Sequence, residues 1–330
     1  MKAKTLYLIG NGFDIQHEIP ANYWDFREFL IANHEEFIRQ MEELYSIQPL
    51  DDTEPWYRPE MEHWNERIKE NLWWNFEHDI GFPDVDSMMS LSSSAAEGLN
   101  RKYGAFLTES TMNAYWREQY GFMGKFQQYV KEWVSSLNLD VVIPIKNELV
   151  NNQNDLFLTF NYSNTLEKVY HIPSYNILHI HGGIAPYCAC PPIMGHGQRK
   201  MISKYRQYAS ENHNHGDGEG ASICNAIANY YQVTLKDTKR IIFNHLDYFK
   251  SLNHIQNVNV IGLSLGSVDF PYLVEVKKSV RRDASWNVYY HGETAHESMK
   301  IVLEQARFKK VDSILKPSSI FWKQGTENTS

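Results

Sequence analysis

The stretch LYLIGNGFDIQHEIP, residues 6–20, begins with a short apolar run that stops at Gly10-Asn11-Gly12. A continuous apolar run of this kind is typical of a strand that is buried on both faces of a parallel sheet. The glycines either close this strand in a tight turn, or they let the backbone approach a phosphate at the start of the next helix. Ile15 replaces the third glycine of the dinucleotide-binding pattern G-x-G-x-x-G, so both interpretations stay open.

Further apolar runs along the chain predict more buried strands. They lie at Val141–Pro144, Leu156–Phe160, Ile177–Ile180, Val258–Leu263 and Trp286–Tyr290, in addition to Thr5–Ile9. Several end at Gly, Asn or Ser, which is where an α/β sheet turns into the loops that hold its ligands. The sequence therefore predicts an α/β protein with a Rossmann-like, doubly wound, mostly parallel sheet.

Helical periodicity fills the long stretch after the first strand. Apolar residues recur at i, i+3, i+4 spacing in YWDFREFL, residues 23–30, and in LWWNF, residues 72–76. More than a hundred residues are too many for one crossover, so we expect a large helical insertion. The expected parts are an α/β core over 1–21 and 139–318, a helical insertion over 22–138, a loop and helical insertion in the core at about 184–254, and a flexible tail over 319–330.

Bulk properties exclude several classes of protein. The 330 residues carry a net charge of −8, which argues against a chain built mainly to coat nucleic acid. Three cysteines are too few for a disulfide scaffold and fit a reducing compartment. No apolar run approaches the roughly 20 residues of a membrane span, and MKAKTLYLIG does not resemble a signal peptide. We expect a soluble cytoplasmic protein without a membrane partner.

Polar residues follow two of the predicted strands. Asn161, Ser163 and Asn164 come after the strand that ends at Phe160. Asn164 is placed to cap the following helix, whereas Asn161 is too early to do so. Asn161 is therefore a candidate for hydrogen bonds to ribose hydroxyls, a carboxamide or a water.

Two histidines alternate in ILHIHGG, residues 177–183. His179 and His181 are expected to point to opposite faces of their strand, so they do not suit one metal ion together. A packed core role is open for each of them. His181, beside Gly182, is the candidate general base, because the pKa of an ordinary histidine lies near working pH.

The segment GLSLG, residues 262–266, follows the predicted strand Val258–Leu263. It is interpreted as a second backbone cradle for a nucleotide. Its letters also match the G-x-S-x-G elbow of serine hydrolases, with Ser264 as nucleophile. Both interpretations stay open.

The cysteines offer a weaker alternative. Cys188, Cys190 and Cys224 with His196 would supply four zinc ligands, but C-x-C is not the usual spacing of such a site. We favour ordinary thiols and expect no metal.

Taken together and in order, five segments resemble the AbiH family of bacterial abortive-infection proteins. They are YLIGNGFDIQHEIPANYWDF, WWNFE, LTFNYSNTLEKVY, ILHIHGG and VIGLSLGSVDFPY. The Gly-x-Gly turn, the Asn-Tyr pair, the His-Gly pair and the later G-x-S-L segment also resemble sirtuin-like NAD-binding proteins. This resemblance implies a cytoplasmic antiviral protein that takes NAD or a related nucleotide as substrate.

The resemblance also implies roles for individual residues. Asn161 matches the asparagine at the nicotinamide ribose or the attacking water, and His181 matches the catalytic histidine. The nucleotide-binding set, including the second cradle, would be Gly10, Asn11, Gly12, Phe13, Asp14, Gly262, Ser264 and Leu265.

Two residues depart from the sirtuin-like pattern. Asp14 stands where a small hydroxyl residue is usual, and Ser163 stands where an Asp follows Asn-Tyr. Both lie where the nicotinamide end of the nucleotide is expected. They therefore argue against cleavage of the nucleotide more than against its binding. The predicted function is hydrolysis of NAD⁺ in abortive infection. A nucleotide sensor without turnover and a serine hydrolase are the alternatives, and a phage-derived trigger or further copies of the chain are the expected partners.

Overall fold

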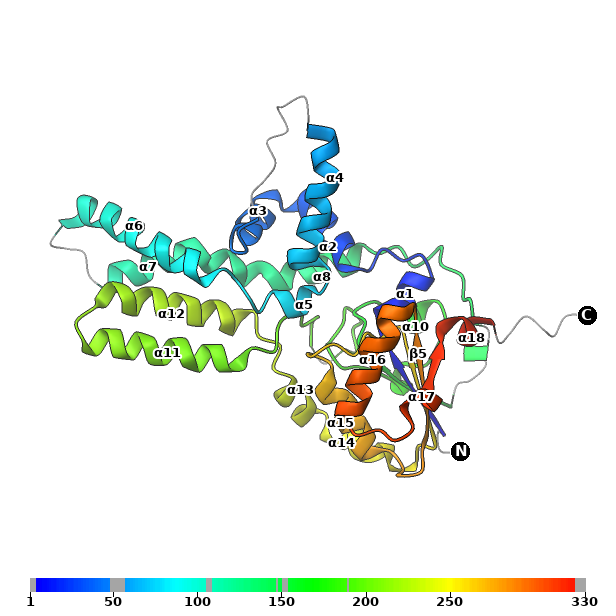
Figure 1. Cartoon of the computed structure of the whole chain (residues 1–330). Coiled ribbons are helices and arrows are strands. Elements are labelled where there is room, and N and C mark those ends of the chain that lie inside the picture. Colours follow the sequence, from blue (N-terminus) through cyan, green and yellow to red (C-terminus); the bar gives the residue numbers. More distant parts are fainter. Residues whose placement is uncertain are drawn as a thin grey trace, which may run out of the picture. The chain divides into compact units, whose positions relative to one another are not determined.

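The computed structural model describes residues 4–47, 57–104, 109–146, 148–149, 154–188 and 190–323 (Figure 1). Contacts divide the chain into two compact units. The first, which we call the α/β unit, comprises Met1–Asn22, Val130–Ile193 and Asp237–Ser330. The second, which we call the helical unit, comprises Tyr23–Tyr129 and Met194–Lys236.

The α/β unit contains a six-stranded sheet in the order β3-β2-β1-β4-β5-β6. All the pairings are parallel, which confirms the predicted doubly wound α/β fold. The strands are β1 (Thr5–Ile9), β2 (Leu156–Thr159), β3 (Ile177–His179), β4 (Asn257–Ile261), β5 (Ser285–Tyr290) and β6 (Leu315–Pro317). The strand order reverses between β1 and β4, and open α/β sheets bind ligands outside the carboxyl ends of the strands at such a switch point.

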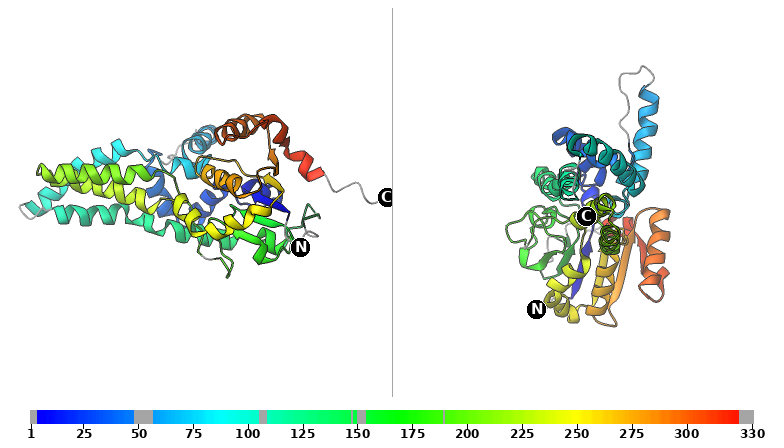
Figure 2. Two further views of the ribbon diagram at one scale, coloured as in Figure 1. Left: turned by 90° about the horizontal axis from the view of Figure 1, so that it is seen from below. Right: turned by 90° about the vertical axis from the view of Figure 1, so that its left-hand side faces the viewer.

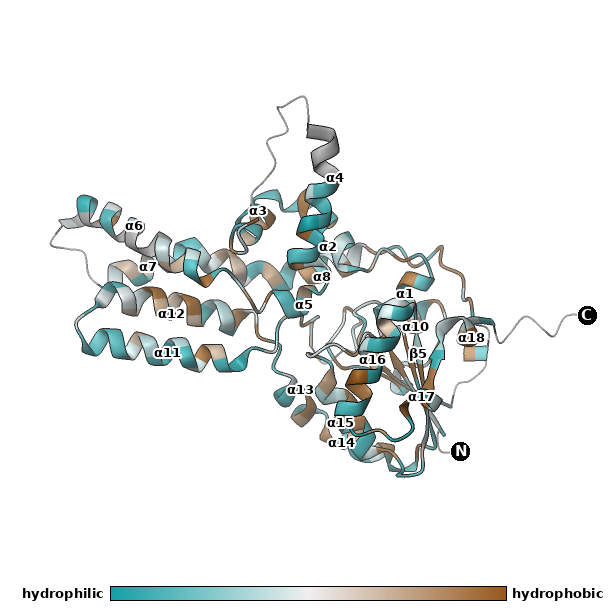
Figure 3. Ribbon diagram, in the orientation of Figure 1, coloured by the Kyte–Doolittle hydropathy of each residue, from teal (hydrophilic) through white to brown (hydrophobic). Residues whose placement is uncertain are grey.

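Helices cover both faces of this sheet. Successive residues of a strand point to opposite faces, so a single strand contributes to two cores. Leu6 and Leu8 of β1 pack into one core, and Ile9 packs into the other. The first core includes residues of α13 (Thr238–Asn244), α14 (Leu246–Ser251), η5 (Leu252–His254), α15 (Phe270–Ser279), α16 (Glu293–Gln305) and α17 (Val311–Ile314). The second includes residues of α1 (Asn11–Gln16), α10 (Thr165–Lys168) and α18 (Ser318–Lys323). Apolar colouring is concentrated in the strands (Figure 3).

One expected strand is wrong. Residues 141–144 form a turn and irregular chain, and Val141 and Ile143 are 74% and 78% exposed. Their apolar run resembles a buried strand, but the side chains face solvent and Pro144 has no amide hydrogen for a ladder. The sixth strand is instead β6, whose three residues are too few to give a pattern.

The C-terminal segment also differs from the expectation of a flexible tail from residue 319. It continues as α18 through Lys323, because Phe321 is only 5% exposed and packs against Tyr289, with ring centroids 5.2 Å apart. Residues 324–330 lie outside the described part of the chain.

The helical unit is largely helical within its described residues. Its helices are α2 (Tyr23–Asn33), α3 (Glu35–Glu43), α4 (Tyr57–Ile68), the π-helix η1 (Lys69–Trp73), α5 (Phe76–Asp79), α6 (Val85–Tyr103), α7 (Glu109–Tyr120), the 3-10 helix η3 (Gly121–Lys125), α11 (Arg199–Asn214) and α12 (Gly218–Val233). The chain of α8 (Phe126–Ser136) passes from this unit into the α/β unit. Helices α11 and α12 lie side by side (Figure 2).

A buried ion pair sits in the core of the helical unit. Arg27 Nε donates to Glu42 Oε1 at 2.7 Å, and the same oxygen accepts from Trp73 Nε1 at 2.8 Å. The ring of Trp73 stacks on Phe76, so these two residues of the WWNFE segment serve this core, whereas Trp74 is 73% exposed. Glu77, the last residue of that segment, accepts from Lys236 Nζ at 2.7 Å. Within the described residues, the helices are all too short or too polar to span a bilayer.

Candidate functional site

The turn after β1 and the turn after β4 lie against each other at the switch point of the sheet. Gly10 N donates to Ile261 O at 2.9 Å, and Gly12 N donates to Gly262 O at 2.8 Å. A Cβ on Gly10 would lie 2.5 Å from the Gly262 carbonyl oxygen. A Cβ on Gly262, whose φ is +65°, would lie 2.3 Å from Phe13 N. The glycines are therefore required for the two turns to pack together.

This packing bears on the expected phosphate cradle. The amides of Gly10, Gly12 and Phe13 already donate to carbonyl oxygens of the protein. The Phe13 side chain is fully buried and packs against Tyr170, with ring centroids 5.4 Å apart. Asn11 is half-buried at the start of α1.

Asp14 follows on α1 and is buried, with 1% of its surface exposed. Ser163 Oγ donates to Asp14 Oδ2 at 2.5 Å, and Ser163 Oγ lies 3.0 Å from Thr165 Oγ1. Burial raises the pKa of Asp14, although hydrogen bonds from Ser163, Thr165 and Asn161 act in the opposite direction. The two residues that depart from the sirtuin-like pattern, Asp14 and Ser163, are thus direct partners.

Asn161 lies beside this carboxylate at the end of β2. It is 7% exposed, and its amide N–H donates to Thr159 Oγ1 at 3.1 Å. Within the described residues, Asp14 Oδ1 and Asn161 Oδ1 are buried oxygens without a hydrogen-bond partner. Buried acceptors are nearly always satisfied, so these two oxygens mark a place for a donor that is not part of the chain, such as a hydroxyl or a water.

His179, the last residue of β3, and His181, in the turn after it, have different partners. His179 Nε2 lies 2.7 Å from Glu167 Oε1, which also accepts from the Tyr187 hydroxyl. The other ring nitrogen, His179 Nδ1, lies 3.2 Å from Asn161 O. His179 is therefore fixed by hydrogen bonds on both sides and positions the Asn161 backbone.

His181 lies in a largely aromatic enclosure after β3. It is 2% exposed, and its ring contacts Phe160 and Tyr272, with centroids 5.3 Å and 5.1 Å away. Its Nε2 lies 3.8 Å from Asp269 Oδ1, at the start of α15. Asp269 is therefore the carboxylate next to the candidate general base.

The second predicted cradle contains the elbow candidate Ser264. This serine is exposed, and α15 begins only at Phe270, whereas a nucleophile elbow turns directly from strand to helix. The positive φ values of this loop belong to Gly262 and to Leu265, at +56°. Leu265 is itself 1% exposed and packs in the core of the sheet. The local geometry therefore differs from that of a serine hydrolase.

The cysteines are divided between the units. Cys188 and Cys190 are half-buried in the α/β unit, and burial raises the pKa of both thiols. Cys224 is buried on α12 of the helical unit, and His196 is fully buried there. In the ranges that the structure describes, no group of three or more His, Cys, Asp or Glu side chains is arranged around a potential metal position.

Two acidic partners were not identified as site residues from the sequence. In the sequence, Glu167 is an ordinary residue at the start of a predicted helix, and Asp269 is a lone acid after the GLSLG segment. Their pairing with His179 and His181 depends on which loops become neighbours, and no local pattern carries that information.

The fold and this polar edge define a doubly wound α/β protein with a candidate ligand site at the carboxyl ends of β1, β2, β3 and β4. Residues 6–290 match the family described as "Bacteriophage abortive infection AbiH". The chain therefore belongs to the AbiH family, and its function is phage abortive infection. Comparison with curated proteins finds no match to this chain, and comparison with solved structures finds none either.

Proposed function

We propose that this AbiH protein acts in abortive infection by hydrolysing NAD⁺ to nicotinamide and ADP-ribose. The observation that carries the proposal is the pair of buried oxygens on Asp14 and Asn161, at the switch point of the sheet, that have no hydrogen-bond partner among the described residues. Ribose hydroxyls and water are donors that would satisfy both. The resemblance of the surrounding segments to sirtuin-like NAD-binding proteins supports the choice of NAD⁺.

In the proposed reaction, the bond between the ribose C1′ and the nicotinamide nitrogen breaks, and nicotinamide leaves as a neutral molecule. The ribose carbon develops oxocarbenium character, which the carboxylate of Asp14 stabilises electrostatically. Asn161 Oδ1 holds the attacking water. The water oxygen bonds to C1′ and its proton passes to His181, which Asp269 stabilises as the imidazolium.

Turnover measurements test this assignment. Purified protein is incubated with NAD⁺, and nicotinamide is measured by chromatography. His181→Ala and Asn161→Ala should each lower kcat by about 100-fold or more, because each removes a group that acts on the water. Ser264→Ala should retain kcat, since Ser264 is exposed and lies outside an elbow, and a rise in KM alone would point to its predicted role in the second cradle.

Each outcome separates the candidates. Loss of turnover in Ser264→Ala alone would point to a serine hydrolase. NAD⁺ binding without turnover by the wild-type protein would point to a nucleotide sensor, a role that the Asp14–Ser163 pair favours because its hydrogen bond engages one oxygen of the carboxylate. Neither binding nor turnover would overturn the nucleotide assignment itself.

A further inference from the structure

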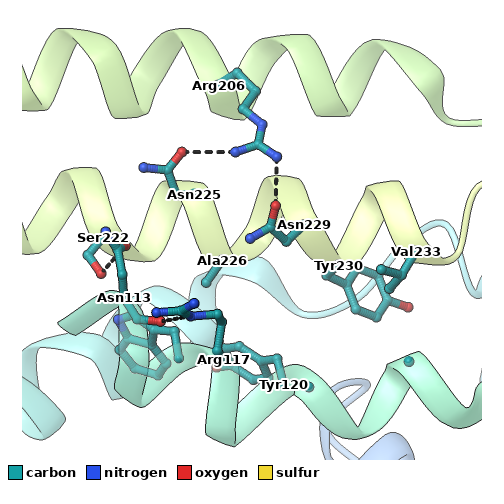
Figure 4. A pocket seen from close by; sticks show the side chains of 13 residues that line it. Asn113, Arg117, Tyr120, Arg206, Ser222, Asn225, Ala226, Asn229, Tyr230 and Val233 are labelled. Carbon is teal, nitrogen blue, oxygen red and sulfur yellow. Dashed lines mark hydrogen bonds between the residues drawn. The ribbon is translucent and has the colours of Figure 1, made fainter. Parts of the chain in front are cut away.

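A pocket lies within the helical unit, bordered by α7, η3, α11 and α12 (Figure 4). Its volume is about 490 Å³, which falls in the range of small-molecule binding sites. It is formed entirely by the helical unit, so it is a different place from the strand edge described above.

One side of this pocket carries an arginine that neutral groups hold in place. Arg206 reaches from α11 toward α12, where its terminal nitrogens donate to Asn225 Oδ1 at 3.2 Å and to Asn229 Oδ1 at 2.6 Å (Figure 4). Amide oxygens orient the guanidinium but do not neutralise it. Arg206 therefore presents a fixed positive charge to the pocket, and a preorganised group loses less entropy when a ligand binds.

A second arginine lines the pocket from α7. Arg117 Nε donates to the backbone carbonyl of Asn113 at 3.3 Å, again a neutral acceptor. None of the residues that line this pocket, all within the described ranges, is acidic. Two cations without a lining carboxylate favour an anionic ligand, and guanidinium groups match phosphate oxygens in particular.

The aromatic wall adds hydrogen-bond donors. Trp116 is 4% exposed, and its ring stacks on Tyr120 with centroids 5.5 Å apart. Within the described residues, Trp116 Nε1 is a buried donor without a partner. Burial raises the pKa of Tyr120 to about 12, so its hydroxyl keeps its proton at neutral pH. The two donors of this wall, Trp116 Nε1 and the Tyr120 hydroxyl, therefore favour a ligand that has a hydrogen-bond acceptor next to a planar, largely apolar surface.

We propose that the pocket of the helical unit binds a nucleotide. Arg117 and Arg206 hold the phosphates, and the ring system lies toward Trp116 and Tyr120. This assignment does not depend on NAD⁺ hydrolysis in the α/β unit. It gives the protein a second ligand site, in the part of the chain that carries no proposed reaction.

Calorimetric titration of the full chain with ADP and with inorganic pyrophosphate tests the site. The Kd of the double variant R117Q/R206Q for each probe should be at least about tenfold higher than that of the wild type. The matched control is Arg101→Gln, which removes an exposed arginine of the same unit and should bind as the wild type does. Adenosine, which carries the ring system but lacks phosphate, should compete far more weakly than ADP.

Two results would overturn the proposal. One is the absence of saturable binding of both probes to the wild type, and the other is equal binding by the wild type and the double variant. Asn161→Ala separates this site from the strand edge, since it should stop NAD⁺ turnover while the Arg-dependent binding persists. Both arginines are exposed, so the double variant is expected to fold, and its far-ultraviolet circular dichroism checks this.

Discussion

At the residue scale, the buried carboxylate of Asp14 at the candidate site differs from a core residue in its pKa and in its hydrogen bonding. Burial raises its pKa, and one of its oxygens has no hydrogen-bond partner in the described chain. A group in this state lowers stability, because an unsatisfied buried polar atom costs about 1–3 kcal/mol. Such a cost persists at positions where a ligand supplies the missing contact.

Replacement of Asp14 by asparagine should therefore stabilise the protein and stop turnover together. Because the pKa of Asp14 is higher in the folded state, the ionised carboxylate destabilises the fold progressively as pH rises above its unfolded value of about 4. The free energy of unfolding of Asp14→Asn should exceed that of the wild type by about 1 kcal/mol or more at pH 7, and the gap should narrow toward pH 4. Urea unfolding at both pH values measures this, and a less stable variant at pH 7 would contradict it.

His196 gives a second prediction at the residue scale, in the helical unit. It is fully buried, its Nε2 lies 3.0 Å from Thr234 Oγ1, and its Nδ1 accepts from Gln198 N at 2.9 Å. Burial lowers its pKa to about 4, so the folded state resists protonation. The contribution of His196 to the free energy of unfolding is therefore fully present above pH 6.5, and it is lost as the pH falls toward 4.

When the pH is lowered from 7 to 5, the depressed pKa of this histidine should reduce the free energy of unfolding by about 2 kcal/mol. Urea unfolding at the two pH values, followed by circular dichroism, measures the loss. His196→Gln should reduce the pH dependence, whereas His63→Gln, at an exposed position of the same unit, should leave it unchanged. An identical pH profile in His196→Gln and the wild type would refute the assignment.

At the element scale, the turns after β1 and β4 form one packed unit. Gly10→Ala should destabilise the protein by about 1–3 kcal/mol or more, because its Cβ would meet the Gly262 backbone at 2.5 Å. Gly266→Ala is the matched control in the same loop, since its Cβ meets nothing closer than Ser264 Oγ at 3.9 Å, and it should change stability by less than about 0.5 kcal/mol. Thermal unfolding compares them. Equal stability of Gly10→Ala and the wild type would show that the glycine serves only a ligand.

The strands also show which parts of the fold can be predicted from a single sequence. β1 was predicted at its observed bounds, and β2, β4 and β5 lie within two residues of prediction, because buried parallel strands are continuous apolar runs. The run at 141–144 failed because its exposure is set by tertiary packing. Asn161 and His181 are predicted site residues because they follow strands, and this stays a prediction. The pairing of Glu167 with His179 and of Asp269 with His181 depends on the strand order, which no local pattern contains.

At the scale of the whole molecule, membership of the AbiH family connects this protein to phage defence. Bacteria expressing the wild-type chain should lose NAD⁺ during infection and release fewer phage, because NAD⁺ hydrolysis would stop metabolism before lysis. Cells expressing His181→Ala at the same level should keep their NAD⁺ and release phage normally. Plaque counts and enzymatic NAD⁺ assays follow both effects. Protection by His181→Ala without NAD⁺ loss would separate defence from this chemistry.

The most direct measurement is mass spectrometry of the nucleotides after purified protein has been incubated with NAD⁺, beside Asp14→Asn and His181→Ala. We expect nicotinamide and ADP-ribose in equal amounts from the wild type, and intact NAD⁺ from both variants. Equal product from the wild type and both variants would contradict the placement of the reaction at the carboxyl edge of the sheet. Intact NAD⁺ in all three samples would contradict hydrolysis by the purified chain.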